Sequence, residues 1–195
     1  MICRENYNEL LKRFGNVASW AMWMEQTGAS PKSNVGDLSV FDDPNLLDKL
    51  NTGFVFVGLN ASNKHDDFLD YSRAWFNFHS SSPRGHDYKL RFALSDTPMW
   101  GSYITDIIKY YPEVDSAKVI NYVKNNPEVL NENIVAFKEE LGLLGGDPTI
   151  VALGNATYDF LKKHLGKEYA IVKVMHFSYR IGKEKYRKEM LKALS

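Results

Sequence analysis

The chain is short of the features that mark membrane proteins and disulfide-bonded secreted proteins. It holds a single cysteine, Cys3, in 195 residues, so no internal disulfide can form. No apolar run approaches the ~20 residues that a membrane-spanning helix needs. Residues 1–6 lack the apolar core of a signal peptide. These absences predict a cytoplasmic protein that has no membrane partner.

Net charge is also lacking, which excludes the strongly basic composition of many obligate nucleic-acid binders. The charge is unevenly distributed, however. Residues 159–195 carry ten Lys or Arg and four Asp or Glu, a net charge of +6, and the rest of the chain carries −6. A local basic face can hold a phosphate backbone without making the protein basic overall. A solvated lysine-rich helix at the end of the chain is the alternative explanation.

Several familiar site motifs are missing as well. No Cys cluster or His/acid spacing indicates a zinc or iron–sulfur site. Phosphate-binding glycine-rich loops, dinucleotide fingerprints and Ser-His-Asp elbows are also absent. We therefore expect neither a metal nor an organic cofactor.

The hydrophobic pattern predicts an α/β fold. Short apolar runs of strand-forming residues alternate with segments of helical periodicity, which is typical of a parallel sheet covered by helices. We expect a three-layer α/β/α sandwich around a mainly parallel four-stranded sheet. The predicted strands cover residues 54–57, 102–107, 149–153 and 170–175.

The length and the absence of a linker or repeat predict one domain over residues 1–195, present as a monomer. Residues 5–50 form a helical N-terminal segment, and apolar residues at helical spacing predict that it begins with a helix over residues 5–25.

Polar clusters follow two of the predicted strands. Gly58–Ser62 comes directly after the first strand, and His176–Arg180 comes directly after the last. Ligand sites of parallel sheets lie outside the carboxyl ends of the strands, so the two clusters can converge on one substrate. The Asn60 amide can hold a water while leaving it neutral, and the His176 imidazole can stabilise a developing anion. Each cluster by itself also fits an ordinary turn.

In combination, these motifs resemble the uracil-DNA glycosylase superfamily, nearest its mismatch-specific uracil/thymine branch. Gly58-Leu59-Asn60 is similar to the first family motif, and His176-Phe177-Ser178 is similar to the His-Pro-Ser motif that precedes the DNA-intercalating loop. Three intervening segments are similar to the aromatic segment that stacks on the flipped base, the strand that reads the base edge, and the glycine turn between the sites. They are Phe76-Asn77-Phe78-His79, Tyr103-Ile104-Thr105-Asp106 and Val151–Ala156, all in the family's order. The resemblance thus implies a glycosylase-like core over about residues 53–190.

The resemblance implies that the protein flips a nucleotide out of DNA and hydrolyses its N-glycosidic bond. Asn60 would position the attacking water, and His176 would stabilise the negative charge on the departing base. The remaining roles are base binding, phosphate contact and filling of the gap in the duplex. They would fall to Phe78, Phe76, Leu59 and Asp106 for the base, Ser62 and Ser178 for phosphates, and Tyr179, Arg180 and Ile181 for the wedge.

The sequence departs from the family pattern in three places. Ala61-Ser62 replaces a proline-containing pair, and Phe177 replaces the proline of His-Pro-Ser. Asp106 stands where uracil-specific members carry asparagine. An ionised carboxylate only accepts hydrogen bonds and would repel a uracil carbonyl, unless burial keeps it protonated. We therefore expect weak excision of uracil and better activity on another lesion, such as a deaminated purine.

Two other functions remain open on the sequence. One is a catalytically inactive module that binds nucleic acid or protein. The other is an enzyme acting on a free nucleoside or nucleotide. A single open pocket lined by Asn60, Phe78 and His176 distinguishes a glycosylase from the inactive module. A narrow pocket without basic surroundings favours the small-molecule enzyme.

Overall fold

The computed structural model describes residues 1–61 and 67–195. Its strands are β1 (Ala18–Trp20), β2 (Asn51–Asn60), β3 (Ser102–Ile108), β4 (Thr149–Leu153) and β5 (Ile171–Val174). Its α-helices are α1 (Arg4–Phe14), α2 (Leu46–Lys49), α3 (Asp87–Leu94), α4 (Ser116–Asn125), α5 (Pro127–Leu144), α6 (Asn155–Leu165) and α7 (Lys183–Leu194), and η1 (Leu38–Asp42) is a 3₁₀ helix. In the described residues, no helix combines the length and apolar character needed to cross a membrane.

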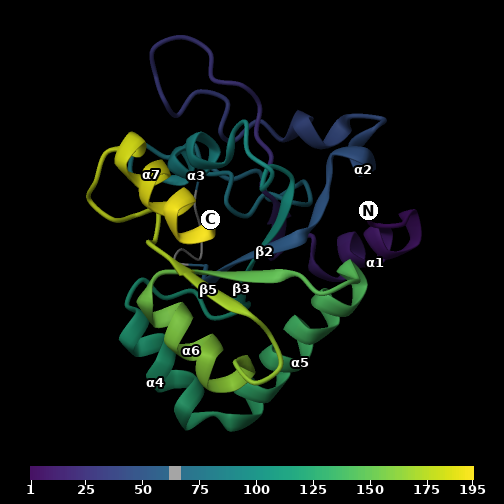
Figure 1. The fold of residues 1–195 in the computed structure, drawn as a ribbon, viewed down its shortest axis with the longest axis vertical. Coiled ribbons are helices and arrows are strands. Elements are labelled where there is room, and N and C mark those ends of the chain that lie inside the picture. Colours follow the sequence, from purple (N-terminus) through teal and green to yellow (C-terminus); the bar gives the residue numbers. More distant parts are fainter. Residues whose placement is uncertain (62–66) are drawn as a thin grey trace.

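The strands form one mainly parallel sheet in the order β1-β3-β2-β4-β5 (Figure 1). Strands β2 to β5 run parallel, so their carboxyl ends meet at the same edge. These are the four predicted strands, and the α/β class is confirmed. The fifth strand, β1, pairs antiparallel with β3 at the sheet margin.

The helix predicted over residues 5–25 is wrong beyond Phe14, because strand β1 lies in its second half. Helix α1 ends at Phe14, and Ala18, Ser19 and Trp20 pair with the edge of β3 instead of continuing the helix. All three β1 residues are fully buried. Burial on both faces suits a strand better than an amphipathic helix, so tertiary pairing decided a segment that the helical periodicity misassigned.

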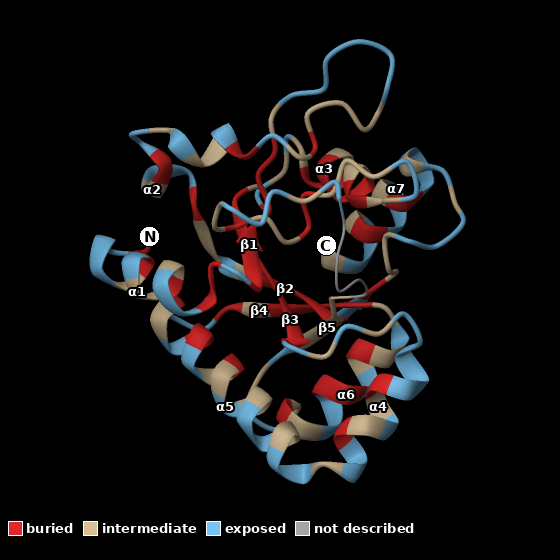
Figure 2. Ribbon diagram, turned by 180° about the vertical axis from the view of Figure 1, so that it is seen from behind, coloured by how far each residue is buried: buried red, intermediate tan, exposed pale blue. Residues whose placement is uncertain are grey.

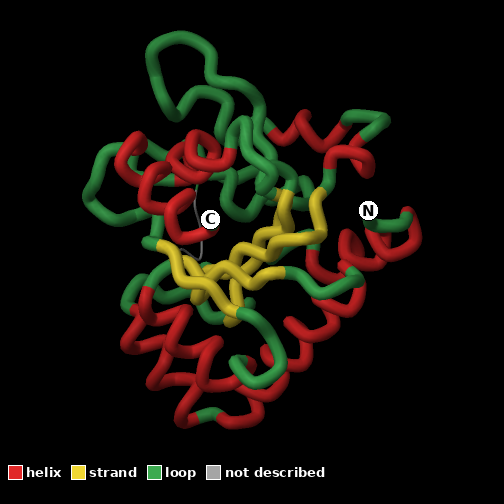
Figure 3. The backbone as a smooth tube through the Cα atoms, in the orientation of Figure 1, coloured by secondary structure: helices red, strands yellow, loops and turns green. Residues whose placement is uncertain are grey.

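The sheet separates two hydrophobic layers because successive side chains of a strand point to opposite faces. In β4, Ile150 and Ala152 pack in the cluster that includes residues of α1, α4, α5 and α6. Val151 and Leu153 pack in the other cluster, with residues of α3 and α7. Figure 2 shows the buried strands between these helical layers, and Figure 3 shows the irregular loops above the sheet on the α3 side.

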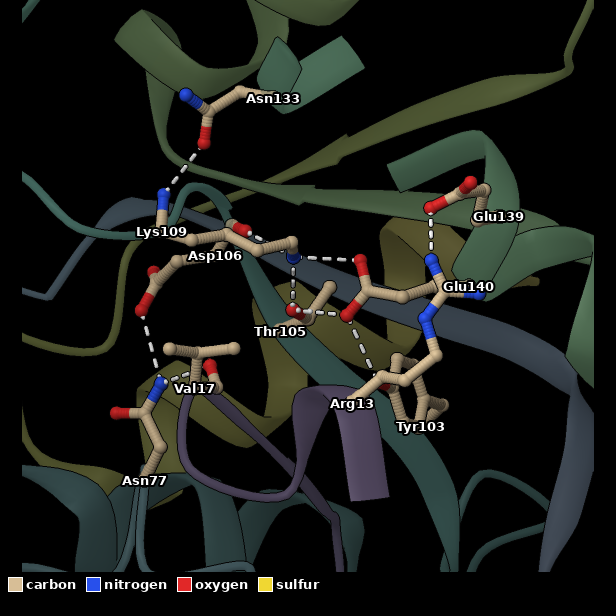
Figure 4. Close-up of polar contacts among 10 residues, drawn as sticks. All are labelled: Arg13, Val17, Asn77, Tyr103, Thr105, Asp106, Lys109, Asn133, Glu139 and Glu140. Atoms are coloured by element: carbon tan, nitrogen blue, oxygen red, sulfur yellow. Dashed lines mark hydrogen bonds and ion pairs between the residues drawn. The ribbon is translucent and has the colours of Figure 1, made fainter. Parts of the chain in front are cut away.

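A buried polar network lies between β3 and α5 (Figure 4). Lys109 Nζ donates to Glu140 Oε2 at 2.6 Å, to Thr105 Oγ1 at 3.0 Å and to the Asp106 carbonyl at 3.0 Å. Glu140 Oε1 accepts from the hydroxyls of Tyr103 at 2.8 Å and Thr105 at 2.9 Å. Both charged side chains are essentially inaccessible to solvent, so the opposite charge and these hydrogen bonds are what make their burial tolerable. The network fixes the C-terminal half of β3, where the candidate site begins.

Breaking this pair from one side is expected to destabilise the fold. Lys109→Met leaves the Glu140 carboxylate buried without its counter-charge, which should lower the free energy of unfolding by about 3–5 kcal/mol. The double change Lys109→Met/Glu140→Leu should recover much of this loss. The exposed Lys138–Glu168 pair supplies the control, and Lys138→Met should change stability by less than about 1 kcal/mol. Urea unfolding measures all three variants, and equal losses for Lys109→Met and Lys138→Met would contradict the assigned role.

Candidate functional site

The two predicted strand-end clusters converge on one cavity at the carboxyl edge of the sheet. Its volume is about 580 Å³, within the range typical of small-molecule sites. Asn60 reaches it from the end of β2, Asp106 from β3, Phe78 from the segment before α3, and His176 from the turn after β5. Side chains from four separate segments therefore share one site.

The Asn60 side chain is oriented by hydrogen bonds from its amide nitrogen. Its Nδ2 lies 2.9 Å from the Tyr111 carbonyl, 2.8 Å from the Glu113 carbonyl and 3.1 Å from the Ala61 carbonyl. Within the described residues, Oδ1 accepts no hydrogen bond. The loop after β3 thus orients the amide, and the remaining acceptor can take a hydrogen bond from a water without removing its proton.

His176 is oriented by its own turn. Its Nδ1 accepts the Ser178 main-chain N–H at 3.1 Å and lies 2.7 Å from the Ser178 hydroxyl oxygen. An accepting Nδ1 assigns the proton of the neutral ring to Nε2. Burial, and to a smaller degree the neighbouring His86, lower the pKa of His176 to about 4, so the ring is neutral at physiological pH. His176 is therefore a neutral hydrogen-bond donor.

Glycine at position 154 makes room for this imidazole. Gly154 has a φ of +94°, a conformation that side-chain-bearing residues rarely adopt, and an added Cβ would lie 3.2 Å from the His176 Cβ. The turn from β4 into α6 therefore passes close beneath His176. The sequence motif Val151–Ala156 thus contributes a close approach of the backbone to the site.

Asp106 lies on the cavity floor and is 3 % exposed. Its Oδ2 accepts from Asn77 Nδ2 at 3.0 Å, and Asn77 Nδ2 also donates to the Val17 carbonyl at 2.8 Å (Figure 4). Burial raises the pKa of Asp106 to about 6, although the Asn77 hydrogen bond and Lys109 favour the charged form. A Cβ at Gly58 would lie 2.2 Å from Asp106 Oδ1, so only glycine fits opposite this carboxyl.

Phe78 is held in a strained conformation beside Asp106. Its φ is +64°, which is uncommon for a residue with a bulky side chain, and Trp75 has a φ of +66°. The Phe78 N–H donates to Asn77 Oδ1 at 3.1 Å, and the Phe78 carbonyl accepts from Trp23 Nε1 at 3.1 Å. The ring is 8 % exposed and meets the Phe177 ring edge-on at 6.3 Å. These hydrogen bonds stabilise a backbone that aims an aromatic ring into the cavity.

The structure places the other predicted site residues differently. Leu59 and Ser178 line the cavity, whereas Phe76 does not, since its ring packs against Tyr71 with the centroids 4.7 Å apart. Tyr179 and Arg180 are exposed and lie outside the lining. Ser62 lies outside the described residues.

Asn77 and His86 are among the lining residues that were not predicted from the sequence. Asn77 contacts both Asp106 and the Phe78 backbone, and His86 lies in the cavity wall just before α3. Asn77 lies between Phe76 and Phe78 in the segment that resembles the base-stacking motif. Its contact with Asp106 could not be predicted because the two residues are remote in the sequence. A signal for His86 was its place in the turn after that aromatic segment.

Outside the cavity, a buried lysine connects α3 to the turn after β5. Lys89 is 3 % exposed, and its Nζ donates to the Tyr179 carbonyl at 2.8 Å. This bond fixes the backbone that presents the exposed Tyr179 side chain beside the cavity. In the described residues, no group of three or more His, Cys, Asp or Glu side chains is arranged to hold a metal ion.

Comparisons of the chain with protein-family models, curated proteins and solved structures each found no match.

The buried Asp106 carboxyl is expected to make stability depend on pH. Its folded-state pKa of about 6 exceeds the unfolded value of 3.8, so the folded protein loses stability from this group as pH rises through that interval. Asp106→Asn should therefore be more stable than the wild type by about 2–3 kcal/mol at pH 8, at ~1.4 kcal/mol per pKa unit. The difference should shrink towards pH 4.

Urea unfolding at a series of pH values tests this expectation. Asp159→Asn, an exposed change on α6, is the matched control and should follow the wild-type profile. A difference between Asp106→Asn and the wild type that stays constant from pH 4 to pH 8 would contradict the assignment.

Proposed function

We propose that the protein is a DNA glycosylase that hydrolyses the N-glycosidic bond of a flipped damaged or mismatched base. The observation that carries the proposal is the convergence of Asn60, Phe78, Asp106 and His176 on one cavity large enough for a base. Each side chain comes from a motif that resembles the corresponding part of the uracil-DNA glycosylase superfamily, in the same chain order.

The flipped base would bind against Phe78, with Leu59 on the adjoining wall. Extrusion of a nucleotide costs a few kcal/mol, which aromatic stacking and hydrogen bonds to the base edge can offset. Phe78 is suited to this role because its backbone is held from both sides by Asn77 and Trp23. A fixed ring loses little conformational entropy when a base stacks on it.

The reaction needs a positioned water and a stabilised leaving group. Asn60 Oδ1 accepts a hydrogen bond from a water, whose oxygen forms a bond to C1′ as the C1′–N bond breaks. The electron pair of the broken bond stays on the base, which His176 Nε2–H stabilises. The proton released from the water ends on the base or in solvent, so the products are a free base and an abasic sugar. A neutral water suffices because the transition state has oxocarbenium character.

DNA contacts would come from the rim. Ser178 Oγ, Arg180 and the exposed Tyr179 follow His176 directly, and Lys89 fixes the Tyr179 backbone. The net charge of +6 over residues 159–195 supplies the long-range attraction to phosphate. Tyr179 would fill the gap that the flipped nucleotide leaves.

One observation favours a second candidate, an enzyme acting on a free nucleoside. The Ser178 hydroxyl is already close to His176 Nδ1, at 2.7 Å, rather than free to bind a phosphate. The same cavity would then break the same bond in a small molecule. Parallel assays of free nucleosides and oligonucleotides separate the two candidates.

Loss of the Asn60 amide or of the His176 imidazole should greatly slow base excision. Asn60→Ala removes the acceptor for the water, and His176→Ala removes the donor to the departing base, so each should slow excision by about 10²–10³. The assay uses single- and double-stranded oligonucleotides that carry uracil, hypoxanthine, xanthine or mismatched thymine, with cleavage of the abasic product as readout. Asn121→Ala, an exposed change on α4, is the control. Lack of turnover on every lesion by the wild type would refute the proposal.

Asp106 should determine which base is removed. At pH 8 its ionised carboxylate accepts hydrogen bonds and repels the uracil carbonyl, so Asp106→Asn should raise uracil excision relative to hypoxanthine excision. Lowering the pH below about 6 should shift the wild type in the same direction, because the protonated carboxyl donates a hydrogen bond. Single-turnover rates on the two lesions at pH 5.5 and pH 8 measure the ratio. Rapid uracil excision by the wild type that is unchanged in the variant would contradict this role.

A further inference from the structure

The cavity contains a second imidazole, that of His86, for which the proposed reaction has so far given no role. His86 immediately precedes α3 and lines the same cavity as His176. The two rings are close enough for charge on one to disfavour charge on the other. His86 is therefore near the group assigned to the departing base.

The Nδ1 atom of His86 is buried and has no hydrogen-bond partner among residues 1–61 and 67–195. Buried polar atoms without a partner are uncommon in folded proteins, and they often mark functional sites. An unprotonated Nδ1 avoids burying an unpaired N–H, which places the proton of the neutral ring on Nε2. The tautomer inferred for His176 places its proton on the same ring atom.

Burial and two nearby cations disfavour the charged form of this second ring. Lys89 Nζ donates to the Tyr179 carbonyl, and Lys32 Nζ donates to the carbonyls of Ser82 and Pro83. Burial, followed by the charges of Lys89 and Lys32, lowers the pKa of His86. The ammonium groups of both lysines are bound to main-chain oxygens, and they contribute positive charge near the cavity wall. His86 supplies the hydrogen-bonding group.

We propose that His86 is a second neutral imidazole donor to the departing base, acting together with His176. The inference rests on the proposed glycosylase function and deepens it. As the C1′–N bond breaks, the electron pair moves onto the base, and two N–H donors share the negative charge. Two donors aimed at one developing anion stabilise it without a proton transfer, in the manner of an oxyanion hole. The site is thereby suited to bases that carry acceptor atoms at two positions of their edge, as deaminated purines do.

The test compares His86→Phe with His86→Gln. Phenylalanine keeps a planar ring near Tyr88 but has no donor, whereas glutamine restores an N–H at similar reach. Single-turnover excision should fall about tenfold to a hundredfold in His86→Phe, and His86→Gln should recover most of the loss. His164→Phe is the matched control, since His164 is a half-buried histidine of α6 that packs on Phe160 away from the cavity. Thermal unfolding verifies that each variant is folded, and His86→Leu replaces the phenylalanine variant if that one is not.

Two further readouts do not depend on turnover. Calorimetry with free hypoxanthine, xanthine and uracil should show base binding by the wild type that weakens in His86→Phe and not in His164→Phe. NMR titration should show a higher pKa for His176 in His86→Phe. His176 titrates near pH 4, where positive charge on His86 disfavours charge on His176, and the variant removes that charge. Arg84, Lys89 and Lys32 remain in both proteins. An unchanged His176 titration would overturn the close coupling of the two rings.

The combined results distinguish this inference from the proposed function. An active wild type with a fully active His86→Phe overturns the role of His86 alone. A wild type that binds free bases through His86 but excises none from DNA refutes the glycosylase and supports the imidazole contact. Base binding that is absent, or identical in the wild type and His86→Phe, overturns the inference.

Discussion

The cavity depends on the close approach of Gly58 to the Asp106 carboxyl. The parallel register of β2 and β3 places these two residues opposite each other, and a Cβ at position 58 would lie 2.2 Å from Asp106 Oδ1. Only a residue without a side chain leaves space for a carboxyl at the cavity floor. Gly154, directly after β4, likewise leaves space for the His176 side chain. Two glycines at strand ends thus open the space that the polar side chains surround.

Burial disfavours the charged form of each titratable group that it shifts in the site. The pKa of His176 is lowered to about 4 and that of Asp106 is raised to about 6, each mainly by loss of solvent. His86 shifts in the same direction as His176. In the adjacent Lys109–Glu140 network, by contrast, opposite charges are buried together and both are fully hydrogen-bonded. Within the described residues, the fold therefore buries Lys109 and Glu140 as an ion pair, whereas Asp106, His86 and His176 of the cavity form no ion pair.

These features reduce the stability of the fold. Three features oppose folding: the left-handed backbone of Phe78, the buried Asp106 carboxyl, and the His86 nitrogen that has no partner in the described part of the chain. The two hydrophobic clusters on either face of the sheet supply the stability that tolerates them. Concentration of such costs in one cavity is typical of sites shaped by function rather than by packing.

The sequence by itself determined four of the strands and their order along the chain. Apolar runs bounded by polar turns identified β2, β3, β4 and β5, and the strand-end positions of Asn60 and His176 followed from those runs. Local patterns carry this information because side-chain alternation and turn chemistry act over a few residues. Strand β1 was missed because Val17 to Met22 also fits helical spacing, and pairing with β3 decided it.

Only the tertiary structure decided which side chains meet. Phe76 and Phe78 are equivalent in the sequence pattern, but a φ of +64° turns Phe78 into the cavity while Phe76 packs on Tyr71. The contacts of Asn77 with Asp106 and the entry of His86 into the cavity wall likewise join residues from separate elements. Such contacts depend on strand register and loop closure over long stretches of chain, which no local pattern specifies.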